Sequence, residues 1–93
     1  GRPEEAASRA RDALDLGTRL RLPPRPGILN TLGLALLELR RLPEAEEALR
    51  RALARCRTER HASGAVLVLN NLALVLRMRG DPGGALALAR EAQ

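Results

Sequence analysis

The chain has 93 residues, of which 45% are hydrophobic and 29% charged, so it is long enough for one small domain. All 16 basic residues are arginines and outnumber the 11 acidic residues, giving a formal net charge of +5 at pH 7. The absence of Phe, Trp and Tyr excludes stacking of single-stranded nucleic-acid bases on aromatic rings, and no long uncharged apolar run suggests a membrane span.

The apolar residues are mainly Leu and Ala, which together with Arg and Glu favour helix, so an all-α fold is expected. Pro3 suits the first turn of an initial helix, and the stretch Pro23-Pro24-Arg25-Pro26-Gly27 ends that helix. Gly80 is expected to end another helix, and Ser63 is a candidate cap. We therefore predict about five antiparallel helices, at 2–20, 28–40, 44–60, 62–79 and 82–93.

An internal repeat organises this helical pattern. The run Leu32-Gly33-x-x-Leu36, followed by Ala45-x-x-x-Leu49-x-x-Ala52, returns 40 residues later as Leu72-Ala73-x-x-Leu76 and Ala85-x-x-x-Ala89-x-x-Ala92. A further partial copy lies 39 residues before the second half of the pattern, at Ala6, Ala10 and Ala13. A fixed period of this size is typical of stacked helical repeats.

This pattern resembles the tetratricopeptide repeat family, with Leu at Leu29, Leu36, Leu42 and Leu49 where the family pattern has aromatic residues. The longer period is similar to the extended repeats of kinesin light chains and of actinobacterial regulators and signalling ATPases. The resemblance implies an α-solenoid of antiparallel helix hairpins: the second helix of a partial repeat at 1–22, then repeats at 27–60 and 62–93, within a longer array. A plain helix bundle and a HEAT or armadillo-like array are the alternatives.

No arrangement of residues suggests catalysis, so we expect a protein without enzymatic activity, metal or cofactor. His61 is the single histidine and is expected to be an ordinary loop residue, which leaves nothing to build a metal cluster or a catalytic relay. Cys56 is expected to be a small buried hydrophobe, although flanking arginines leave a reactive thiol as an alternative.

The resemblance implies a concave groove lined by the first helix of each repeat. From the first repeat it assigns Asn30, Thr31, Leu34, Leu37 and Glu38 to that groove, and from the second Asn70, Asn71, Leu74, Arg77 and Met78. An Asn amide offers donors and acceptors to a peptide backbone, and Arg77 could hold a carboxylate. In the alternative reading, Asn30 and Asn70 form hydrogen bonds between helices, and Leu34 and Leu74 belong to the core.

We therefore expect a protein-interaction module that binds a peptide or helix, within a larger cytoplasmic bacterial regulator or signalling protein. A second hypothesis is self-association, or packing on other domains, through exposed terminal helices. A third, less favoured, is nucleic-acid binding through Arg50, Arg51, Arg55 and Arg57. No membrane association is expected.

Overall fold

The computed structural model describes residues 1–92, the side chain of Ala92 excepted. Five helices follow one another: α1 (Arg2–Arg19), α2 (Pro26–Glu38), α3 (Leu42–Thr58), α4 (Ala62–Met78) and α5 (Pro82–Ala92). No strand occurs in this part of the chain. The all-α prediction and the number of helices are therefore confirmed.

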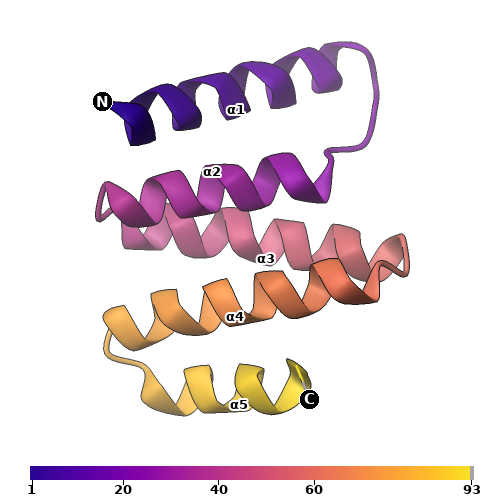
Figure 1. The fold of residues 1–93 in the computed structure, drawn as a ribbon. Helices are drawn as coiled ribbons and strands as arrows, with labels where there is room; N and C mark the ends of the chain where they lie inside the picture. The colour runs from indigo at the N-terminus through magenta and orange to yellow at the C-terminus, as the bar shows by residue number, and fades with distance from the viewer. Residues whose placement is uncertain (93) are drawn as a thin grey trace.

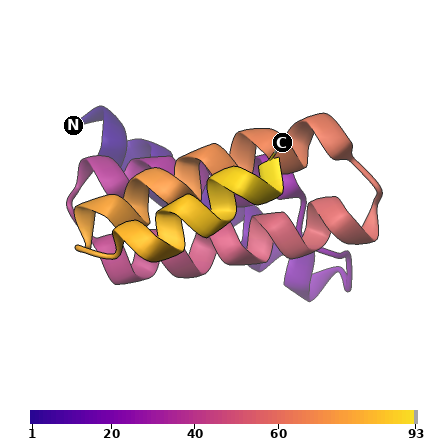
Figure 2. The ribbon, with the colours of Figure 1, turned by 90° about the horizontal axis from the view of Figure 1, so that it is seen from below.

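The helices form a stack in which each one packs against the next in antiparallel orientation, with α1 and α5 at opposite ends (Figure 1). In addition, α2 contacts α4, so the first helices of the two hairpins lie next to each other. Seen along the stack, the helices run lengthwise in the same general direction (Figure 2). The Cα atoms span 38 × 32 × 16 Å, and the shortest extent leaves room for about two layers of helices.

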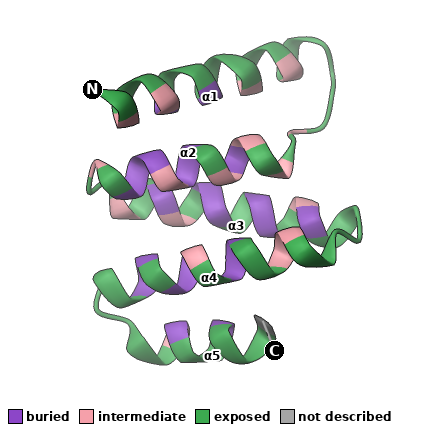
Figure 3. Cartoon of the chain, in the orientation of Figure 1, coloured by how far each residue is buried: buried purple, intermediate pink, exposed green. Residues whose placement is uncertain are grey.

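The core lies mainly on the three central helices (Figure 3). Its largest fully buried side chains include Leu36 on α2, Leu49 on α3 and Leu72 on α4. Cys56 is also fully buried, which confirms its predicted role as a small core residue. By contrast, α1 buries only Ala7 and Ala10, so this helix is held by a narrow stripe of small residues.

Two helix starts differ from the sequence prediction. Helix α2 begins at Pro26, two residues earlier than expected, because a proline at the first helical position has a suitable φ and needs no hydrogen-bond partner for its nitrogen. Helix α4 is capped by His61 instead of Ser63, since the His61 Nδ1 accepts a hydrogen bond of 3.1 Å from the backbone N–H of Gly64. The Asp81 carboxylate accepts the equivalent bond from Gly84.

The ends of α1 to α4 share one backbone arrangement, in which the residue after the C-cap adopts a positive φ. These residues are Arg21, Arg40, Arg60 and Gly80. At the end of α3, the Arg60 N–H donates to the Arg57 carbonyl and the His61 N–H to the Cys56 carbonyl, the bond pattern of a Schellman motif. The prediction that Gly80 ends a helix is confirmed, whereas the three arginines in the same geometry were not expected.

Gly33 allows close packing within the first hairpin. A Cβ atom at this position would lie 2.6 Å from the Cγ and Cδ2 atoms of Leu49. The predicted need for a small residue is therefore confirmed, although the group that fills the space is the Leu49 side chain instead of the neighbouring backbone.

Candidate protein-interaction surface

Two of the predicted groove residues bind each other. The Asn71 side-chain amide on α4 donates a hydrogen bond of 3.0 Å to the Asn30 Oδ1 on α2, and both side chains are partly buried. This is the alternative reading of Asn30, in which it links neighbouring helices, but its partner is Asn71 and not a residue outside the chain. Asn70, one position earlier on α4, is exposed.

Asn70 and Arg77 lie together at the C-terminal end of the stack. They line a groove of 400 Å³ between α4 and α5, opposite Pro82, Leu86 and Ala89. Both side chains are exposed, so their polar groups remain available to a ligand.

Thr31, Leu34 and Glu38 lie on the opposite side of the Asn30–Asn71 pair, toward α1. They line a shallow groove of 220 Å³ with Arg2 and Pro3 at the start of that helix. Leu37, by contrast, is buried with 7% of its surface exposed, so the prediction that it faces a groove is wrong. The predicted residues are thus spread over three neighbouring places on α2 and α4 and do not converge in one pocket.

Helix α4 carries an apolar exposed stripe that the sequence reasoning covered only in part. Leu67, Leu74 and Met78 retain 54%, 41% and 38% of their surface, and Val66 beside them is also exposed. Leu74 was predicted as a groove residue and Met78 was named with it, whereas Leu67 was missed. A helical projection of 62–79 could have found Leu67, because it lies seven residues before Leu74 on the same face.

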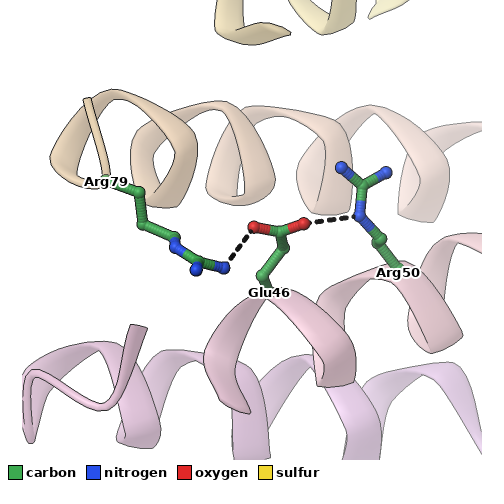
Figure 4. Close-up of polar contacts among 3 residues, drawn as sticks. All are labelled: Glu46, Arg50 and Arg79. Atoms are coloured by element: carbon green, nitrogen blue, oxygen red, sulfur yellow. Dashed lines mark hydrogen bonds and ion pairs between the residues drawn. The ribbon is translucent and has the colours of Figure 1, made fainter. Parts of the chain in front are cut away.

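The arginines on α3 are largely engaged in ion pairs. Glu46 accepts from Arg50 at 2.9 Å and from Arg79, just after α4, at 2.8 Å (Figure 4). Arg55 pairs with Glu59, and Arg57 pairs with Glu91 of α5. Three of the four arginines proposed for nucleic-acid binding are therefore occupied by carboxylates, which weakens that hypothesis.

The two bonds to Glu46 also affect its titration. The hydrogen bond from Arg50, supported by the one from Arg79, holds the pKa of the Glu46 carboxyl below its ordinary value of 4.5, although partial burial opposes this. Glu46 thus joins α3 to the end of α4 as a charged group at neutral pH.

Residues 24–93 match the family model for the tetratricopeptide repeat. The chain belongs to the tetratricopeptide repeat family. Neither the curated proteins nor the solved structures gave a significant match. The matched part holds the hairpins α2–α3 and α4–α5, and tetratricopeptide repeats generally mediate protein–protein interactions.

Helix α1 precedes the matched residues, yet it makes contacts like those of α3. It packs against α2 as α3 packs against α4. Its Arg11 forms an ion pair with Glu44 of α3, and Arg57 of α3 forms one with Glu91 of α5. These pairs join residues 33 and 34 positions apart, so we infer that α1 takes the place of the second helix of a tetratricopeptide repeat.

The other reactive side chains are engaged or buried in the tetratricopeptide fold. Burial, followed by the negative charge of Glu59, raises the pKa of the Cys56 thiol and so disfavours its thiolate. Within residues 1–92, no group of three or more His, Cys, Asp or Glu side chains could hold a metal ion. None of the five described helices is long and apolar enough to cross a membrane.

Proposed function

We propose that this tetratricopeptide chain is a non-enzymatic module that binds a peptide or helix of a partner protein on the exposed face of α2 and α4. The observation that carries the proposal is the apolar stripe of Leu67, Leu74 and Met78 on α4, next to the free polar groups of Asn70 and Arg77. We place the module in a larger cytoplasmic bacterial regulator or signalling protein, in keeping with its single cysteine and its arginine-rich, lysine-free composition.

The stripe suits a partner that brings apolar side chains. Burying exposed apolar surface contributes about 25 cal/mol per Å², so three partly exposed large side chains on one helix face could supply a substantial part of a binding free energy. Asn70 can donate to and accept from the partner's backbone, and Arg77 can bind a carboxylate. Polar groups beside an apolar stripe fix the orientation of a ligand that the stripe alone would bind loosely.

The experiment uses a peptide selected from a random library against the intact chain, with its affinity measured by calorimetry. Replacing Leu74 and Arg77 together by Ala should weaken binding at least tenfold without changing the melting temperature. The matched control replaces Arg51 and Arg90, which lie away from this face, and should bind normally. Selection of peptides whose binding survives the Leu74 and Arg77 substitutions would contradict the proposed surface.

Self-association through an end helix is a second candidate, favoured by Leu86 of α5. This side chain is 54% exposed at the C-terminal end of the stack and lines the groove with Asn70 and Arg77. Sedimentation velocity would then show a molar mass that rises with protein concentration and a return to monomer in the Leu86→Ser variant. A monomer at all concentrations excludes this candidate.

A further inference from the structure

A second groove lies at the N-terminal end of the stack, separate from the α4 stripe. It has a volume of 590 Å³ and runs between α1, which supplies Ala6, Ala10 and Ala13, and the start of α2, which supplies Ile28 and Thr31. Arg9 and Arg25 also line it, and both are exposed.

The internal repeat contains a filled counterpart of this groove. Displaced by one repeat, Ala10, Ile28 and Thr31 correspond to Leu49, Val68 and Asn71, on α3 and α4. Those residues are covered by α2, because Gly33 packs on Leu49 and Asn30 accepts the hydrogen bond from Asn71. The N-terminal groove therefore has the shape of a helix seat, and α2 shows how a helix lies in it.

Three substitutions distinguish the open seat from the filled one. Arg9 and Arg25 stand where the filled seat has Ala48 and Ala65, and neither arginine forms an ion pair with any described carboxylate. Ala10 stands where the filled seat has Leu49, so the open seat is wider at this point. The seat thus offers two positive charges and extra room to its occupant.

We infer that the groove between α1 and α2 binds an acidic amphipathic helix of a partner protein. This helix carries Asp or Glu near Arg9 and Arg25, a Leu or Met where α2 has Gly33, and an Asn or Gln that accepts from the Thr31 hydroxyl. A second copy of the chain is a poor occupant. Its α4 presents Arg77 at the position where α2 presents Leu37, which would bring like charges together.

The test uses a fluorescent helical peptide built on the α2 sequence, with Leu in place of Gly33 and Glu on both flanks of the apolar stripe. We expect binding to the intact chain, measured by anisotropy, that weakens as salt is raised. The Arg9→Gln/Arg25→Gln variant should lose about threefold to tenfold in affinity, as expected for two partly exposed ion pairs. The Arg51→Gln/Arg90→Gln variant carries the same change in charge elsewhere and should bind like the original chain.

A charge exchange separates this recognition from general attraction to a basic protein. The Arg9→Glu/Arg25→Glu variant should bind a Lys version of the peptide better than the Glu version, with helicity and melting temperature showing that it still folds. Equal binding of the Glu, Gln and Lys peptides to the original chain would overturn the inference. Concentration-dependent self-association that Arg9→Glu/Arg25→Glu alters would assign the groove to a second copy instead. Leu74→Ala, on the separate α4 surface, should leave this peptide's binding unchanged, so each proposal can fail without the other.

Discussion

The side chains of Asn30 and Asn71 join the first helices of successive hairpins through one amide–amide hydrogen bond of 3.0 Å. The bond lies between the two faces to which the other exposed polar residues of α2 and α4 belong. It therefore fixes the spacing of those faces, and its loss should affect stability before it affects binding.

Replacing Asn71 by Ala should destabilise the chain by about 1–2 kcal/mol, because the partly buried Asn30 amide would lose its partner. Asn70→Ala is the matched control and should change stability by less than about 0.5 kcal/mol, since Asn70 is exposed and has no such bond. Urea unfolding followed by far-ultraviolet circular dichroism measures both, as the chain has no aromatic fluorophore. A double substitution of Asn30 and Asn71 that is fully additive would contradict the coupling.

Gly33→Ala should destabilise the chain by about 1–3 kcal/mol, because the added methyl group would overlap the Leu49 side chain. The cost should fall when Leu49 is also replaced by Ala, although Leu49→Ala alone is expensive. The second repeat has this combination naturally, with Ala73 and Ala89 at the two positions. The coupling is read from unfolding free energies of the two single variants and the double variant. A Gly33→Ala chain as stable as the original would disprove the close contact.

Arg60→Gly should stabilise the chain by about 0.5–1 kcal/mol. Arg60 has a φ of 55°, which costs a residue with a side chain about 1–2 kcal/mol, while the greater freedom of glycine in the unfolded chain offsets part of the gain. The opposite change, Gly80→Ala at a φ of 82°, should destabilise by a similar amount. Thermal unfolding of the two variants should shift the midpoint in opposite directions, and a shift in the same direction would be inconsistent with the left-handed geometry.

Glu46→Gln should lower stability at pH 7 by about 0.5–1 kcal/mol, since it removes the charge shared by Arg50 and Arg79. The folded-state pKa of Glu46 lies below its ordinary value of 4.5, so its contribution is complete above that value and disappears as the pH falls through the lowered pKa. The stability difference between the original chain and the variant should therefore vanish near pH 2. A difference that grows in acid would exclude the ion pairs as its source.

The sequence was informative where residue type alone decides the backbone. The periodic Leu and Ala, the prolines and Gly80 located all five helices, and the starts of α2 and α3 fell within two residues of their predicted positions. Arg21, Arg40 and Arg60 carry no such signal, because arginine rarely adopts a positive φ. The repeat held the missing clue, since Arg40 lies 40 residues before Gly80.

The surface was harder to predict because exposure depends on which helices lie alongside. The repeat pattern assigned Asn30, Asn70 and Asn71 to one groove, but neighbouring Asn residues on one helix point to different neighbours. Asn71 turns toward α2, whereas Asn70 turns toward α5. The choice between a hydrogen bond inside the protein and a bond to a partner follows from this difference of one position, which residue type does not reveal.

The Gly33–Leu49 contact has a consequence for the shape of any array containing this chain. A glycine against a leucine in one hairpin and two alanines in the next, Ala73 and Ala89, set the interhelical distance by different means. Small changes in that distance accumulate along a helical repeat as curvature and pitch. These buried pairs thus provide a way to adjust the bend of a solenoid while the residues on its binding face stay the same.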